Sequence, residues 1–185
     1  MSPRRIAVEG PNGVGKSTVA AELARLLSPS AIFAYPSEAP PLFSAKLTRE
    51  ERAVWYLNDM DARMLDECER LEEGRSIIRD RDRLSTEVYQ AGTDDDFASW
   101  IRTWSTANGI VPADVTLVLY LPDDERERRL AASPRGARAE LGDAEERARI
   151  ARLYRHHAAT YPGAVEVSAE GPLEEVVARC MAVLG

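Results

Sequence analysis

The sequence predicts an α/β protein in which a doubly wound, five-stranded parallel sheet is flanked by helices. Five short apolar runs alternate along the 185-residue chain with stretches of helical periodicity, a pattern typical of parallel strands joined by crossover helices. The run over 115–121 is almost wholly apolar, as expected of a strand that is covered on both faces. No repeat or long linker divides the pattern, so we expect a single domain over residues 1–185.

The elements of the first half are bounded by residues that end or cap regular structure. Pro36 ends the second strand, because proline lacks the N–H that a strand uses. Thr48 and Glu51 form a capping-box pattern at the start of a long helix, and Gly74 ends it. In order, we expect a strand over 4–9, a helix over 16–27, a strand over 31–35, a helix over 48–73 and a strand over 76–80.

The second half follows the same rules, with Gly109 ending one helix and Asp143 capping another. In order, we expect helices over 84–91 and 94–108, a strand over 115–121, helices over 123–132 and 143–161, a strand over 164–168 and a helix over 173–184. Ligands bind at the carboxyl ends of parallel strands. We therefore expect functional residues after Glu9, Tyr35, Asp80, Leu121 and Ser168.

Composition excludes several classes of function. A formal net charge of −7 provides no basic excess to neutralise phosphates, so we expect no nucleic-acid partner. No apolar run reaches the length of a membrane span, and no signal peptide is recognisable. We expect a cytoplasmic protein without a membrane partner, in which Cys68 and Cys180 are reduced.

Residues 10–17 read Gly-Pro-Asn-Gly-Val-Gly-Lys-Ser and fit the phosphate-binding pattern G-x-x-x-x-G-K-[ST] at every fixed position. The glycines allow consecutive N–H groups to face phosphate oxygens, and the following helix adds its positive end. The Lys16 ammonium can reach the β- and γ-phosphates, and the Ser17 hydroxyl can ligate Mg²⁺. We expect a nucleoside triphosphate to be held by Asn12, Gly13, Val14, Gly15, Lys16, Ser17 and Thr18.

A second pair, Asp80-Arg81, ends the third expected strand beside this loop. The Asp80 carboxylate can hold Mg²⁺ directly or through water, and the Arg81 guanidinium can grip an acceptor phosphate. With Ser85, Tyr89 and Gln90 at their spacing, the pair resembles the thymidylate kinase family. The resemblance continues through Pro112-Ala113-Asp114 and residues 151–154 to residues 167–176, and so covers nearly the whole chain.

The resemblance implies a P-loop kinase fold that transfers the γ-phosphoryl group of ATP, with Mg²⁺, to a nucleoside monophosphate, either dTMP or a related nucleotide or deoxynucleotide. It implies catalytic roles for Lys16 and Arg81, metal binding by Ser17 and Asp80, and a homodimer. The acceptor-site residues that it implies are Asn12, Glu38, Tyr56, Arg81, Ser85, Tyr89 and Gln90, with Trp55 as the alternative to Tyr56 for stacking on the base.

A lid is expected over about 133–142, where Pro134 and Gly136 provide hinge-like breaks. Family members whose phosphate loop lacks an arginine tend to place one in the lid. Since this loop has Gly13 and Val14 at that place, Arg135 and Arg138 are the expected catalytic arginines, and the sequence does not decide between them.

The chain departs from the family pattern in its acceptor site. Asn12 stands where the family usually has Asp or Glu, and Asp82 where it usually has an aromatic residue. Counted back from Gly74, Met60 occupies the place of a base-reading arginine, for which Arg63 could substitute after a shift in alignment. The accepted base and sugar, and the choice of ATP or GTP as donor, therefore stay open.

Two other functions fit the same motifs. In a kinase of nucleosides or other small hydroxylated metabolites the acceptor carries no phosphate, and Glu9 or Glu38 is the candidate base. A nucleotide-driven switch would hydrolyse the triphosphate without any acceptor.

Two clusters resemble metal sites. Asp94, Asp95 and Asp96 precede an apolar-periodic helix, where carboxylates are favourable without a ligand. His156 and His157 are adjacent in a helical pattern, so we expect them to point in different directions on a solvated face. We interpret neither cluster as a metal site.

Overall fold

The computed structural model describes residues 2–36, 46–133 and 142–185. Five parallel strands form one sheet in the order β2-β3-β1-β4-β5. The strands are β1 (Arg5–Glu9), β2 (Ser30–Ala34), β3 (Ser76–Asp80), β4 (Val115–Tyr120) and β5 (Ala164–Ser168). The α/β class, the five strands and their parallel pairing are confirmed.

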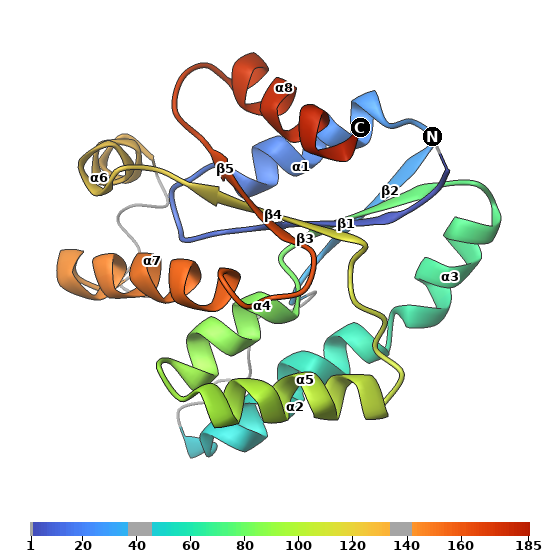
Figure 1. The fold of residues 1–185 in the computed structure, drawn as a ribbon, viewed down its shortest axis with the longest axis horizontal. Coiled ribbons are helices and arrows are strands. Elements are labelled where there is room, and N and C mark those ends of the chain that lie inside the picture. The colour runs from blue at the N-terminus through green and yellow to red at the C-terminus, as the bar shows by residue number, and fades with distance from the viewer. Residues whose placement is uncertain (1, 37–45, 134–141) are drawn as a thin grey trace.

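Helices cover both faces of the sheet, with α1 and α8 on one side and α2, α4, α5 and α7 on the other (Figure 1). The helices are α1 (Lys16–Leu26), α2 (Arg49–Asp61), α3 (Met64–Glu72), α4 (Arg83–Thr86), the π-helical segment η2 (Glu87–Ala91), α5 (Asp95–Ala107), α6 (Asp123–Ala131), α7 (Ala144–Ala158) and α8 (Leu173–Leu184). Across the described ranges, no helix combines the length and apolar character that crossing a bilayer requires.

The hydrophobic core lies in layers on the two faces of the sheet. On one face, Val8 and Leu117 of the central strands pack with Leu23 of α1 and Val177 of α8. On the other face, one cluster joins β2 and β3 to α2 and α5, and another joins α4 and η2 to α7. Burial on both faces explains why the strand sequences are apolar rather than alternating.

The strand order brings the predicted site residues to one edge. From β1 the chain runs out to β2, returns to β3 beside β1, and then crosses to β4 on the other side. Val8 of β1 is paired with both Asp80 and Leu117, so the carboxyl ends of these three strands are adjacent. This edge is the topological switch point, where doubly wound sheets bind their ligands.

Two helical predictions differ from the structure. The helix expected over 48–73 is two helices, because Ala62 and Arg63 leave the helical path between α2 and α3. There the Arg63 guanidinium donates to the carbonyl oxygen of Ala34 at 3.3 Å and lies over the rings of Phe33 and Tyr35. The helix expected over 84–91 is α-helical only in its first turn and then widens into η2.

Candidate active site

A cleft of about 830 Å³ opens at the carboxyl edge of the sheet. The predicted site residues that line it are Asn12, Gly13, Gly15, Lys16, Ser17, Thr18, Tyr56, Asp80, Arg81, Ser85, Tyr89 and Gln90. They come from the loop after β1, from α1 and α2, and from the segment that runs from the end of β3 into η2. The structure therefore brings together residues that are up to 78 positions apart in the sequence.

The loop between β1 and α1 needs glycine for its close approaches. Gly10 has φ +134°, and a Cβ there would lie 2.4 Å from the carbonyl oxygen of Leu119 in β4. Gly13 has φ +90°, and its Cβ would lie 2.7 Å from Cγ of Leu130 in α6. Lys16 is 7% exposed, and its Nζ donates to the carbonyl oxygen of Pro11 at 2.9 Å, so the ammonium lies within the curve of the loop.

The amino end of α1 is suited to an anion. Gly15 is its N-cap and supplies no side chain to bond the first N–H groups of the helix. These donors and the helix dipole favour phosphate oxygens at this end. Val14, predicted to contact the donor, turns its side chain into the core at 1% exposure. Any contact of Val14 with a phosphate is therefore made by its backbone.

Arg81 connects the phosphate loop, through Asn12, with the side of the cleft that Tyr56, Tyr89 and Gln90 line, which we call the acceptor wall after the predicted role of these residues. Its φ of +78° is the one positive value among the described non-glycine residues, and such strain persists where surrounding contacts hold it. Nη1 donates to Ser85 Oγ and to Tyr154 Oη, both at 3.1 Å, and Nη2 donates to Asn12 Oδ1 at 2.7 Å. Three of the five N–H donors of the guanidinium thus hold it in place.

The cleft also holds oxygen ligands suited to a hard cation. The hydroxyl of Ser17 and the carboxylate of Asp80 line the same cleft from α1 and from the end of β3. Hydroxyl, carboxylate and phosphate oxygens are the ligands that Mg²⁺ prefers. The residues therefore fit a magnesium–nucleotide complex in chemistry as well as in place.

The model of the thymidylate kinase family matches residues 8–180, which is nearly the whole chain. The chain belongs to the thymidylate kinase family. It is accordingly an ATP-dependent phosphotransferase of the nucleotide and nucleoside kinases. No curated protein matches the chain.

Solved structures agree on the fold. The thymidylate kinase from Candida albicans has a TM-score of 0.72 and 19% identity, over 99% of this chain and 91% of that one. The deoxyadenosine kinase from M. mycoides, solved with bound dATP, has a TM-score of 0.73 and 19% identity, over 98% of both chains. At this identity the similarity shows a shared fold.

Within this kinase, Glu9 is a structural carboxylate. It is fully buried, and its Oε1 accepts from the backbone N–H groups of Asp82 and Ser85 at 2.7 and 2.9 Å. Its Oε2 accepts from Ser85 Oγ at 2.7 Å and from Tyr154 Oη at 3.3 Å. Burial raises the pKa of Glu9 above its ordinary value, although nearby Arg81 and these hydrogen bonds lower it. With four donors around it and no place in the cleft wall, Glu9 is not positioned to deprotonate an acceptor hydroxyl.

The acceptor wall is aromatic and amphipathic. Tyr56 lines the cleft, whereas Trp55 packs edge-on against Tyr56 outside it, so Tyr56 is the aromatic available to a base. Tyr89 is 41% exposed and meets Tyr154 edge-on. Gln90 Oε1 accepts from Arg52 Nε at 3.0 Å, which leaves the Gln90 amide nitrogen as a donor.

Two departures from the family pattern have structural explanations. Met60 is in the cleft wall at 2% exposure. Arg63 is not among the lining residues: its guanidinium donates to the carbonyl oxygen of Ala34 at the margin of the cleft, so it does not occupy the place of a base-reading arginine. Asp82 caps α4 by accepting from Arg83 N at 2.8 Å, and it pairs with buried Arg79 at 3.2 Å.

The sequence reasoning missed the buried network around Arg79. The Arg79 guanidinium is fully buried and donates to both carboxylate oxygens of Glu67, at 2.9 and 2.7 Å. Glu67 Oε1 also accepts from Tyr35 Oη at 2.7 Å, and Tyr35 lines the cleft. The network therefore supports the acceptor wall from behind, and a charged residue inside a strand was its one visible signal.

The sequence reasoning also missed the contribution of α6, from which Arg129 and Leu130 line the cleft together with Ser133, the first residue of the predicted lid. Arg129 donates to Glu125 Oε1 at 2.8 Å and to the carbonyl oxygen of Ala169 at 3.1 Å. It thus joins α6 to the loop after β5. The predicted residues Glu38, Arg135 and Arg138, and most of the predicted lid, lie outside the described residues.

Proposed function

We propose that this kinase transfers the γ-phosphoryl group of ATP to a nucleoside monophosphate, with dTMP or a related nucleotide or deoxynucleotide as acceptor. The observation that carries the proposal is the placement of Arg81 between the phosphate loop and the aromatic wall. Two of its N–H donors remain after its three contacts with described side chains. A planar guanidinium with two such donors suits an acceptor phosphate.

On the donor side, the loop amides and Lys16 hold the β- and γ-phosphates. Ser17 and Asp80 hold Mg²⁺, which when bound neutralises charge that develops on the phosphoryl oxygens. Phosphoryl transfer needs little covalent assistance, so positioning and charge neutralisation supply most of the catalysis. Arg135 and Arg138 of the lid are proposed to complete that neutralisation and to exclude water.

On the acceptor side, Tyr56 stacks on the base, and Gln90 donates to it through the amide nitrogen that Arg52 leaves available. Ser85 and Tyr89 position Arg81 and the sugar-phosphate, and Asn12 accepts from the sugar or from Arg81. Glu38 is proposed to join this wall. We further propose a single-domain, cytoplasmic enzyme that acts as a homodimer.

The test is ADP release from Mg-ATP in the presence of dTMP, dUMP, dCMP, dGMP, UMP, CMP and the matching nucleosides. Stimulation by one or more monophosphates supports the proposal, and the preferred base identifies what the Tyr56–Gln90 wall accepts. Stimulation by nucleosides alone would reassign Arg81 and favour the nucleoside kinase alternative. Hydrolysis that no acceptor changes would favour a nucleotide-driven switch.

A further inference from the structure

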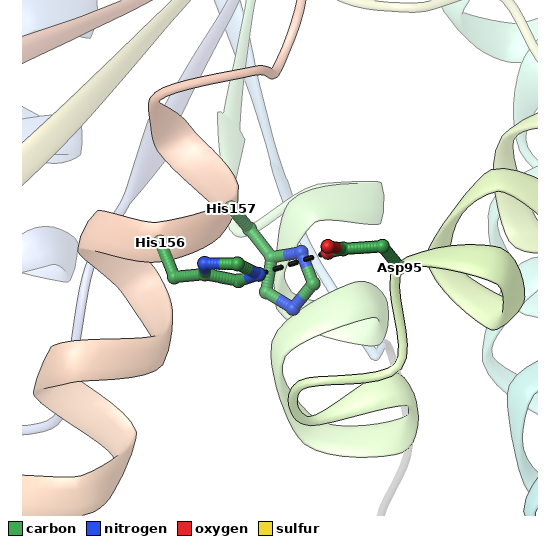
Figure 2. A group of neighbouring side chains, drawn as sticks. All are labelled: Asp95, His156 and His157. Atoms are coloured by element: carbon green, nitrogen blue, oxygen red, sulfur yellow. Dashed lines mark hydrogen bonds and ion pairs between the residues drawn. The ribbon is translucent and has the colours of Figure 1, made fainter.

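A group of metal-binding side chains lies apart from the cleft, where the carboxyl end of α7 meets the amino end of α5 (Figure 2). The chain contains two histidines, and both are here. His156 Nε2 lies 2.8 Å from Asp95 Oδ1, and one ligand atom from each of Asp95, His156 and His157 lies within 4.8 Å of the others. The expectation of a solvated face is confirmed for His156, whose side chain is 46% exposed, and is wrong for His157, which is 1% exposed; the two rings lie 5.0 Å apart rather than diverging.

His157 is held in an orientation suited to a metal ligand. Its Nε2 lies 2.6 Å from the carbonyl oxygen of Gly92, and a carbonyl can only accept, so Nε2 carries the proton. The lone pair is therefore on Nδ1, which Figure 2 shows on the side of the Asp95 carboxylate. A ring N–H bonded to a backbone carbonyl is the arrangement that fixes the tautomer of histidines that bind metals.

We propose that Asp95, His156 and His157 form a site for a transition-metal dication, with Zn²⁺ as the ion that fits best. Two imidazoles and a carboxylate are a set of Zn²⁺ ligands that leaves a fourth position for water. Tetrahedral bonds of 2.0–2.1 Å place ligand atoms about 3.3 Å apart, so separations that now lie within 4.8 Å must shorten by at most about 1.5 Å. His156 and Asp95 have side-chain exposures of 46% and 76%, so both are free to make this adjustment around buried His157.

The site would join elements that carry the acceptor wall. Gly92 follows η2, which holds Tyr89 and Gln90, and Asp95 is the first residue of α5. His156 and His157 share α7 with Tyr154, whose hydroxyl contacts Arg81 and Ser85. A bound ion would therefore connect α7, α5 and the end of η2 at a distance from the reacting groups.

The experiment is a Zn²⁺ titration of the full chain, free of a histidine tag and of nucleotide, by competition with a chromogenic chelator. We expect one ion per chain, and a dissociation constant at least tenfold weaker in His156→Gln and in Asp95→Asn, since even the loss of a second-sphere partner typically costs 10–100-fold. Both substitutions are at exposed side chains and are expected to fold. Asp96→Asn removes the same charge from the next residue, also exposed, and should bind as tightly as the wild type.

Histidine-selective ¹⁵N NMR then tests the ligand atoms, because the chain gives two imidazole spectra. Zn²⁺ should shift Nδ1 of His157 and Nε2 of His156 and leave Nε2 of His157 protonated. Failure to bind one ion, or equal affinity in Asp95→Asn, His156→Gln and Asp96→Asn, would overturn the proposal and leave a hydrogen-bonded His–Asp pair. These measurements require no phosphoryl transfer, so their outcome does not depend on whether the proposed acceptor is correct.

Discussion

The phosphate loop and the acceptor wall line the same cleft, yet the loop is shaped by its main chain and the wall by its side chains. The loop is a contiguous segment in which Gly10 and Gly13 allow close packing against β4 and α6. The wall combines Tyr56 of α2 with Tyr89 and Gln90 of η2, and other side chains contact each of them. The donor half should therefore be sensitive to changes of backbone conformation, and the acceptor half to the loss of single hydrogen bonds.

The largest expected effect on stability comes from a substitution in the phosphate loop, where the main chain packs closely against β4. Gly10→Ala combines a φ of +134° with a Cβ only 2.4 Å from a β4 carbonyl oxygen. We expect it to lower the free energy of unfolding by about 3 kcal/mol, from strain and overpacking together. Urea denaturation measures this. Gly74→Ala is the control, since Gly74 has φ +81° and no atom within 4 Å of its Cβ position, and it should cost about 1 kcal/mol. Equal losses would contradict the role given to the close approach.

Next in size is the loss of the side chain that joins the two halves. Arg81→Ala should lower kcat/KM for a monophosphate acceptor about 100-fold, equivalent to ~2.7 kcal/mol of transition-state stabilisation, with the KM for ATP nearly unchanged. Steady-state kinetics with the acceptor varied will show this. Arg63→Ala removes an arginine that lies outside the cleft and should change acceptor kinetics little. Unchanged acceptor kinetics in Arg81→Ala would remove Arg81 from its proposed role.

A smaller effect is expected from the contact between the halves. Asn12→Ala removes the acceptor for Arg81 Nη2 at 2.7 Å. Since a hydrogen bond to a charged group contributes about 1.5–3 kcal/mol, we expect kcat/KM for the acceptor to fall roughly tenfold. Asn12→Asp keeps the acceptor oxygen and adds a charge, so it should retain activity. If Asn12→Asp were as impaired as Asn12→Ala, the hydrogen bond would not be the relevant property.

The smallest effect concerns pH. Burial raises the pKa of Glu9 in the folded state, so the folded protein binds more protons than the unfolded chain as pH rises above the ordinary glutamate value near 4.5. Stability from this group is fully present below that value and is lost as pH rises through the folded pKa. We expect the free energy of unfolding to fall as pH rises, by a fraction of the ~1.4 kcal/mol per pH unit that a difference of one whole bound proton would give. Urea midpoints at several pH values should show a flatter profile in Glu9→Gln, and an identical profile would exclude Glu9 as the source.

The comparison also explains what the sequence could predict. The phosphate loop could be recognised because its geometry depends on residues that are neighbours in the chain. The break between α2 and α3 could not, since Arg63 is held by the end of β2, 29 positions away, and no Pro or Gly marks it. Asp82 stands where the family usually has an aromatic residue, and its carboxylate pairs with the buried Arg79 guanidinium. The sequence could not show this pairing, because the burial of Arg79 depends on how α3 packs against β3.

The Asp94–Asp96 and His156–His157 clusters, which we did not interpret as metal sites, also show that sequence does not reveal contacts between distant segments. The interpretation of Asp94, Asp95 and Asp96 as carboxylates at the start of a helix is confirmed: Asp94 is the N-cap of α5 and accepts from Phe97 N at 2.9 Å, and the other two lie in its first turn. The next residue, Asp95, instead reaches His156, which is 61 positions away. Periodicity within one helix contains no information about how α5 meets α7, so neither cluster by itself indicates that the other lies beside it.

The π-helical turn η2 makes the acceptor wall depend on the number of residues as well as on their identity. A π-turn contains one residue more than the α-helix around it. Deleting one residue within Glu87–Ala91 would be absorbed by rewinding the segment as α-helix, so the residues after the deletion would keep their direction. The same deletion in an α-helical stretch would turn every following side chain by about 100°. The widened turn therefore makes the length of this part of the cleft wall adjustable, whereas substitutions change only the side chains that it presents.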